Sequence, residues 1–167
     1  MDPVEKHLQN LSAKAKKNRK ENQAFFKKLR KLKGGKLDGI IHEQHEEVFE
    51  ETDCLTCANC CKTTGPLFTE KDIERLAKHF RMRPAEFVTQ YLHKDEDNDW
   101  VLNVLPCPFL GADNYCSIYE VRPKACREYP HTDRRNQREI LSLTQRNIAS
   151  CPAVFEMVER MKKNAGV

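Results

Sequence analysis

The sequence has little apolar material from which to build a core. Hydrophobic residues make up 39% of the chain and charged residues 32%, with a single tryptophan and a mean hydropathy of -0.75. No stretch approaches the ~18 consecutive apolar residues of a membrane-spanning helix, so we expect no membrane partner. A chain of 167 residues is long enough for one modest core. Something besides apolar burial is therefore expected to help hold the fold together.

A secretory signal is also missing from the sequence as it stands. The N-terminal stretch "MDPVEKHLQN" lacks the basic segment and apolar run of such a signal. We therefore expect a cytoplasmic protein. Cysteines rarely persist as structural disulfides in a reducing compartment, and metal binding or redox chemistry more often explains them there.

Charge is distributed unevenly along the chain. Residues 1–36 carry twelve Lys or Arg against three Asp or Glu, whereas residues 37–53 carry seven acids and no Lys or Arg. Three parts are predicted: a basic amphipathic helical arm at 1–36, an acidic helix at 37–53, and a cysteine-cluster metal-binding domain at 54–167. The two oppositely charged segments are expected to have different partners.

Helical patterns cover much of the chain. Apolar residues at helical spacing predict one basic helix in the arm, which Gly34 and Gly35 are expected to end. A second helix is predicted at 37–52. Thr69 is a predicted N-cap with Asp72 three residues on, and Pro84 fits the first turn of the following helix.

Regular structure is expected to be sparser in the second half. The acidic stretch at 95–99 predicts a turn, the segment after Trp100 alternates like a short strand, and residues 152–163 have helical spacing. We predict a mainly α, small, loop-rich domain stapled by cysteine–metal coordination. It has an N-terminal helical hairpin and one short β-hairpin near residues 100–116.

The stretch "CLTCANCC" places four thiols within the eight residues 54–61. A Cys-x-x-Cys unit brings two thiolates toward one ion, and here the unit occurs twice in succession. Neighbouring side chains diverge on a helix or strand, so Cys60 and Cys61 are not both expected to serve one mononuclear ion. Lys62 alone is a weak basis for making Cys61 a catalytic nucleophile.

The other four cysteines are spread over the second half, so a shared site would tie distant segments together. Eight cysteines match two four-thiolate zinc sites, but they equally suit one iron–sulfur cluster with four thiols left over. His42 and His45 stand three apart on the predicted acidic helix and are possible imidazole ligands. The alternative is that His45 packs on the apolar face while His42 is solvated.

From "CLTCANCC" through "CPFL" and "CSIYEVRPKACREYP" to "CP", the chain resembles the YkgJ-type cysteine-cluster family of zinc- or iron-chelating CxxCxxCC domains. The resemblance covers about residues 53–155. It implies a zinc or iron–sulfur cofactor and a helical turn between Pro123 and Pro130 that presents a cysteine. The metal ligands that it implies are Cys54, Cys57, Cys60, Cys61, Cys107, Cys116, Cys126 and Cys151.

Three functions compete at this point. The first is a cytoplasmic metal-binding module, with a partner protein possible, whose fold depends on thiolate coordination. The second is an iron–sulfur redox or radical enzyme component, although no catalytic residue can be named. The third is binding of nucleic acid or an acidic partner through the basic arm, which has cations enough for several phosphate contacts. The arm is equally expected to pack on the acidic helix.

Overall fold

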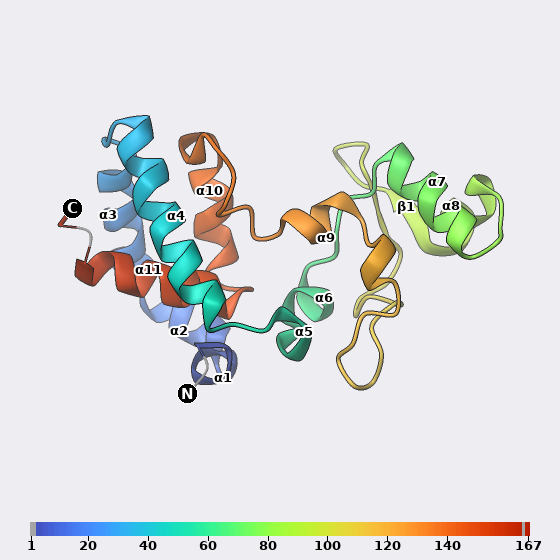
Figure 1. Cartoon of the computed structure of the whole chain (residues 1–167), viewed down its shortest axis with the longest axis horizontal. Coiled ribbons are helices and arrows are strands. Elements are labelled where there is room, and N and C mark those ends of the chain that lie inside the picture. The colour runs from blue at the N-terminus through green and yellow to red at the C-terminus, as the bar shows by residue number, and fades with distance from the viewer. Residues whose placement is uncertain (1–2, 165) are drawn as a thin grey trace. The chain divides into compact units, whose positions relative to one another are not determined.

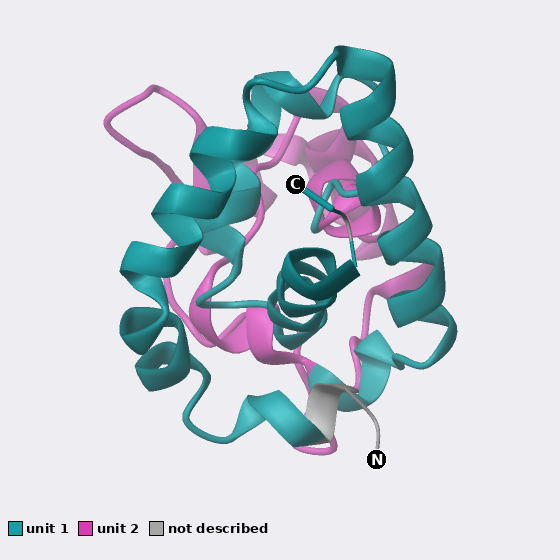
Figure 2. Cartoon of the chain, turned by 90° about the vertical axis from the view of Figure 1, so that its left-hand side faces the viewer, with its two compact units in different colours: residues 1–57, 130–167 teal, residues 58–129 magenta. Residues whose placement is uncertain are grey.

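Helices dominate the computed structural model, which describes residues 3–164, 166 and 167 (Figure 1). This confirms the mainly α class predicted from the sequence. The chain divides into two compact units (Figure 2). Residues 1–57 and 130–167 form unit 1, and residues 58–129 form unit 2.

Unit 1 joins the two ends of the chain. Its helices are α1 (Pro3–Leu8), α2 (Leu11–Lys17), α3 (Arg19–Leu29), α4 (Gly34–Glu50), α5 (Cys54–Cys57), α10 (Gln137–Asn147) and α11 (Pro152–Asn164). Helix α4 packs chiefly against α11 and α10, and α1 packs against α11. Figure 1 shows α11 crossing α4. Burying one apolar stripe of each helix against the others provides the core, whose largest members include Phe26, Leu37, Ile41 and Met157.

The single helix predicted for the basic arm is wrong. Asn10 has a left-handed backbone with φ 61°, which separates α1 from α2, and Asn18 separates α2 from α3. Asparagine tolerates the left-handed conformation seen at Asn10 because its short side chain can form local hydrogen bonds. Gly34 and Gly35 do not end the arm helix either. They form the first turn of α4, after α3 has already ended at Leu29.

The acidic helix is confirmed as α4, although its described partners lie in the C-terminal part of the chain. Asp38 accepts hydrogen bonds from the backbone amides of Asn136 and Gln137, both at 2.9 Å. These two bonds cap the start of α10, a helix that the sequence analysis missed. Glu51, just after α4, pairs with Arg160 of α11 at 2.8 Å.

Unit 2 contains the remaining elements. They are α6 (Asn59–Thr63), α7 (Glu70–His79), α8 (Pro84–Tyr91), β1 (Leu92–Lys94), β2 (Trp100–Leu102), the 3-10 helix η1 (Tyr119–Val121) and α9 (Lys124–Glu128). The predicted Thr69 cap is confirmed, since Thr69 Oγ1 accepts from Asp72 N at 3.1 Å and Asp72 Oδ2 accepts from Thr69 N at 2.9 Å. Pro84 opens α8 as predicted.

The predicted β-hairpin is present, but it lies earlier in the chain. β2 begins at Trp100 and pairs antiparallel with β1, with Leu92 opposite Leu102. The acidic turn between them is confirmed: Asp95 Oδ1 accepts from the amides of Asp97 at 3.0 Å and Asp99 at 2.9 Å. Asn98 closes the turn with a left-handed φ of 64°.

An aromatic-rich cluster forms the core of unit 2. Its buried members are Phe68, Ile73, Leu76, Ala77, Phe87, Leu92, Leu102, Phe109 and Ile118. Phe109 stacks on Phe87 with ring centroids 6.3 Å apart and on Phe80 at 5.5 Å. Cys107 and Cys116 pack against this cluster. Two of the predicted ligands therefore adjoin an apolar core.

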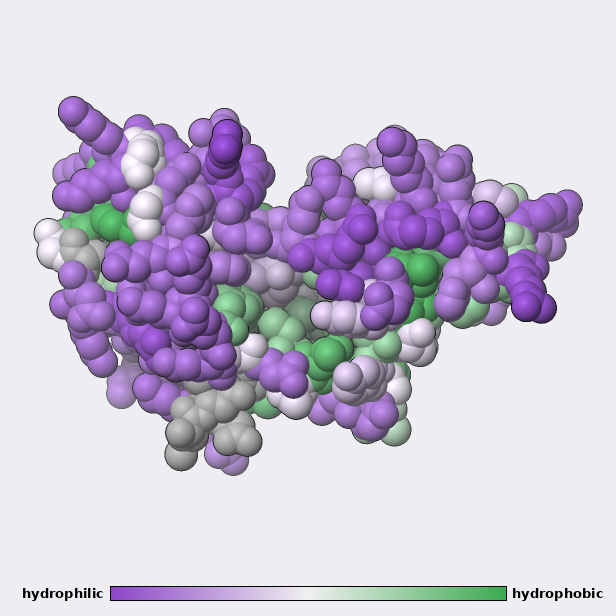
Figure 3. Space-filling view, in the orientation of Figure 1, coloured by the Kyte–Doolittle hydropathy of each residue, from purple (hydrophilic) through white to green (hydrophobic). Residues whose placement is uncertain are grey.

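One face of the molecule, drawn in Figure 3, is mostly polar. Hydrophilic residues predominate on the face drawn in Figure 3, with smaller apolar areas between them. Among the residues that the structure describes, no helix combines the length and the apolar character needed to cross a membrane.

Candidate metal centre

The eight cysteines fall into two groups, one in each unit. Cys54, Cys57 and Cys151 belong to unit 1, and the electrostatic influence of the first two reaches the Cys151 thiol. The other five belong to unit 2, where the Cys61 thiol acts electrostatically on three thiols from distant segments. The unit 2 group comprises Cys60, Cys61, Cys107, Cys116 and Cys126. The fold therefore gathers cysteines that are far apart in the sequence.

A backbone hydrogen bond ties the sequence cluster to the second half of unit 2. The amide of Cys107 donates to the carbonyl oxygen of Cys61 at 2.8 Å. Cys61 lies in the short helix α6, and Cys107 follows a cis peptide bond between Leu105 and Pro106. The two cysteines are thus held as neighbours by main-chain atoms, independently of their thiols.

A tight loop carries Cys107 and Cys116. The amide of Gly111 donates to the carbonyl oxygen of Tyr115 at 2.8 Å, and Leu110 and Cys116 form an isolated antiparallel bridge. A side chain at Gly111 would place its Cβ 2.6 Å from an Asp113 oxygen. The close approach at this position explains the glycine.

Cys126 is presented by α9, the single helical turn predicted between Pro123 and Pro130. The buried carboxylate of Asp72 anchors this segment by accepting from the Lys124 amide at 3.1 Å. Arg75 bonds the same carboxylate at 2.7 Å and donates to the carbonyl oxygens of Val121 at 3.2 Å and Arg122 at 2.9 Å. Helix α7 thereby fixes the backbone that leads into Cys126.

Asp72 and Arg75 are site-positioning residues that the sequence analysis missed. The capping pattern identified Asp72 as a helix cap, and that part is confirmed. Its second role depends on a residue 52 positions along the chain, Lys124, which no local pattern indicates. Such long-range contacts become visible only once the fold is known.

Cys61 has a thiol that ionises more readily than an ordinary cysteine. A hydrogen bond from the Cys60 side chain, the Cys61 amide and the charge of Lys62 together outweigh burial and lower its pKa from 9.0 to about 7. The expectation that Cys60 and Cys61 do not both serve one mononuclear ion stays a prediction.

The other unit 2 thiols are harder to ionise. Burial raises the pKa of Cys107 and of Cys116, and it raises that of Cys126 to about 12. Opposing this, the backbone amides of Phe109 and Leu110 lower the pKa of Cys107, and that of Ile118 lowers the pKa of Cys116. These amides favour negative charge on sulfur once a cation compensates for burial.

Arg122 contributes positive charge to the same group. Its field lowers the pKa of Cys116 and Cys126 against the larger effect of burial. The guanidinium lies 3.9 Å from the Tyr119 ring centroid and donates to the Tyr119 carbonyl oxygen at 2.6 Å. The side chain is thus held in position by local contacts.

Unit 1 places Cys151 immediately before α11. Its carbonyl oxygen accepts from the Phe155 amide at 3.0 Å. The backbone amides of Val154 and Ala153 lower the pKa of its thiol, as the amides at a helix N-terminus favour an anion. Burial nevertheless dominates and raises the pKa of Cys151 to about 12. Cys54 and Cys57 stand at the two ends of the helical turn α5.

The two candidate histidines have other hydrogen-bond partners. His42 Nε2 donates to the Arg134 carbonyl oxygen at 2.7 Å. His45 Nδ1 bonds Thr132 Oγ1 at 2.7 Å, and its ring stacks on Phe49 with centroids 4.4 Å apart. These contacts give both imidazoles a role in joining α4 to the segment before α10.

The donor set fits a thiophilic metal. Four sulfurs from separate segments suit tetrahedral zinc or an iron–sulfur cluster, and backbone amides that favour the thiolate form support bound thiolates. Across residues 3–164, 166 and 167, however, no three Cys, His, Asp or Glu side chains already form a group that could hold an ion. A bound metal would therefore have to draw the thiols closer together than they lie here.

Comparison with known protein families gives a match over the cysteine-rich part of the chain. Residues 53–152 match the family model CxxCxxCC, described as "Putative zinc- or iron-chelating domain". No curated protein and no solved structure matches the chain. The matched span covers more than half of the chain and contains all eight cysteines. The chain therefore belongs to the CxxCxxCC family of zinc- or iron-chelating domains.

Proposed function

We propose that the chain binds metal through two separate sets of thiolates. The first set, in unit 2, consists of Cys61, Cys107, Cys116 and Cys126. The second, in unit 1, consists of Cys54, Cys57 and Cys151. The observation that carries the proposal is the match of residues 53–152 to a metal-chelating family. The main-chain bond from Cys107 to Cys61 at 2.8 Å supports the first set, because it holds two of its members as neighbours. Cys60 remains a predicted ligand that the proposal assigns to neither set.

The residues around the first set support a structural role for the metal. Phe109 anchors the Cys107–Cys116 loop in the apolar core, and Asp72 with Arg75 anchors the segment carrying Cys126. When bound, the metal supplies the positive charge that keeps buried thiols ionised. Its binding energy then adds to the stability of a unit with a small core. We propose a cytoplasmic setting for this activity, since the ligands must stay reduced.

Zinc and an iron–sulfur cluster remain the two candidate cofactors. One observation favours the redox alternative: the second set contains only three thiols. In thiolate sites, a coordination position without a protein ligand is typical of centres that exchange ligands or substrates. An iron–sulfur centre there would make the chain a redox or radical enzyme component.

The test is anaerobic purification followed by measurement of zinc, iron and acid-labile sulfide per chain, with the visible spectrum. Structural zinc predicts about two zinc ions per chain and a colourless protein. A cluster predicts iron with matching sulfide and a brown chromophore. Protein that binds neither metal, even after reconstitution under reducing conditions, would refute the proposal.

A further inference from the structure

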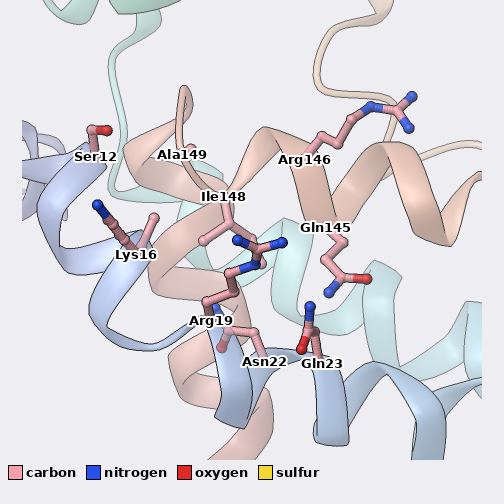
Figure 4. A pocket seen from close by; sticks show the side chains of 10 residues that line it. Ser12, Lys16, Arg19, Asn22, Gln23, Gln145, Arg146, Ile148 and Ala149 are labelled. Carbon is pink, nitrogen blue, oxygen red and sulfur yellow. The ribbon is translucent and has the colours of Figure 1, made fainter.

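A hollow of about 440 Å³ lies in unit 1 among α2, α3 and the C-terminal end of α10, and no cysteine is among its lining residues (Figure 4). Its volume is within the range of small-ligand sites. Its lining contains no acidic residue. The polar side chains of the lining that could bind a ligand are those of Lys16, Arg19, Asn22, Gln23, Gln145 and Arg146.

The cations of this hollow lack carboxylate partners. Within the described part of the chain, no ion pair joins Lys16, Arg19 or Arg146 to an acid. Elsewhere in unit 1, Arg160 and Lys162 each pair with two carboxylates. Uncompensated positive charge is therefore concentrated at a concave surface, which attracts an anion. In Figure 4 the Arg19 guanidinium lies in the middle of the group, whereas Arg146 extends away from it.

A buried amide in the same hollow lacks a hydrogen-bond partner. Asn22 is only 3% exposed, and its Oδ1 has none among the described residues. An unsatisfied buried acceptor is costly and uncommon. A fully ionised anion has no proton to offer this oxygen, but a hydroxyl group has one. A ligand that satisfies both the unpaired cations and the Asn22 oxygen carries an anionic group and a hydroxyl group.

The lining also argues against a nucleobase. No aromatic side chain borders the hollow, and recognition of unpaired bases depends on stacking against aromatic rings. Gln23 and Gln145 offer amides, which bond hydroxyls well. We propose that this hollow binds a phosphorylated sugar or polyol, with its phosphate on Lys16 and Arg19 and a hydroxyl on Asn22.

The experiment is isothermal titration of the full chain, as purified, with ribose 5-phosphate at fixed ionic strength. Inorganic phosphate and ribose are titrated separately. Ribose 5-phosphate is expected to bind more tightly than either. Lys16→Gln and Arg19→Gln should each weaken that binding by about tenfold, because each removes a charge-assisted contact to phosphate.

The matched control is Lys20→Gln, which removes an exposed positive charge from α3 outside the lining. It should leave the affinity unchanged. Asn22→Ala should reduce the preference for ribose 5-phosphate over phosphate. Since that buried change also risks misfolding, checked by circular dichroism, the two cation variants carry the test independently.

Three results would overturn the proposal. One is the absence of measurable binding of ribose 5-phosphate. Another is equal weakening by all three cation variants, which would indicate only diffuse attraction. The third is tighter binding of a short oligouridylate than of ribose 5-phosphate, lost in the same variants. That outcome would make the hollow part of a nucleic-acid surface.

Discussion

The amide of Cys107 donates to the carbonyl oxygen of Cys61 at 2.8 Å. This bond holds Cys61, the last cysteine of the CxxCxxCC motif, beside Cys107, which lies 46 positions further along the chain, and it depends on no thiol. The backbone therefore brings the two sulfur-bearing segments together before any metal is considered. Metal binding would then require only that the cysteine side chains adjust.

Removing the Asp72 carboxylate charge tests whether α7 positions Cys126. Asp72→Asn weakens the bonds to Arg75 and to the Lys124 amide. Unfolding free energy should fall by about 1–3 kcal/mol, as for other buried groups left without partners. Metal bound by unit 2 should also dissociate faster. Glu86→Gln is the control, because it alters an exposed pair with Arg83 of the same three-residue spacing. If both variants lose the same unfolding free energy and release metal at the same rate, Asp72 does not position Cys126.

The Gly111 site makes a steric prediction. Alanine there would bring Cβ to 2.6 Å from Asp113 Oδ1 and 3.2 Å from the Tyr115 carbonyl oxygen. Gly111→Ala should therefore lower stability by about 1–3 kcal/mol. Gly39→Ala in α4 meets no atom within 4 Å and should raise it by ~0.5–1 kcal/mol. Urea unfolding measures both, and a Gly111→Ala chain as stable as the parent would contradict the loop geometry.

Metal-free protein should lose stability in alkali. Burial raises the pKa of both Cys126 and Cys151 from 9.0 to about 12. Thiols of the unfolded chain ionise first, so the stability that these groups contribute below pH 9.0 disappears as pH rises through about 12. Urea unfolding of chelator-treated protein across this range measures the loss. A double serine variant at the two positions should show a shallower decline, and an equal decline would argue against buried thiols.

Acid should loosen the contact between α1 and α11. Burial alone would raise the pKa of Glu156, but hydrogen bonds from His7 at 2.5 Å and Arg160 at 2.9 Å, with Lys6, lower it to about 2. A carboxyl group whose pKa is lower in the folded state stabilises the fold at pH values above 4.5, the pKa of the unfolded chain. That stabilisation is lost as the pH falls through about 2, the pKa in the folded state.

Glu156→Gln should therefore flatten the acid side of the stability profile, measured as the thermal midpoint between those limits. Glu139→Gln alters an exposed pair with Arg134 and should keep the parental profile. Identical profiles for all three proteins would show that Glu156 does not govern the acid response.

Local patterns predicted local structure well. The Thr69 cap, the start of α8 at Pro84, the helix from Pro152 and the turn presenting Cys126 are all confirmed. Each depends on residues within a few positions of one another. The breaks at Asn10 and Asn18 were missed because asparagine is compatible with both a helix and a turn. Helix α10 was missed because its start is capped by Asp38, about a hundred positions earlier.

The candidate site was predicted in part. Its cysteines were identified from their spacing and from the family resemblance, and the family is confirmed. Their division between units was not predicted, because it follows from the long-range contacts that make residues 58–129 a compact unit.

The most direct test of the two-set account is metal content per chain in Cys126→Ser and in Cys151→Ser, purified anaerobically beside the parent. Each variant removes one member of one set. The account predicts that each loses one centre and retains the other, giving about half of the parental metal. Loss of all metal from both variants would indicate a single centre shared by the whole motif, and parental metal content in both would contradict thiolate coordination by these cysteines.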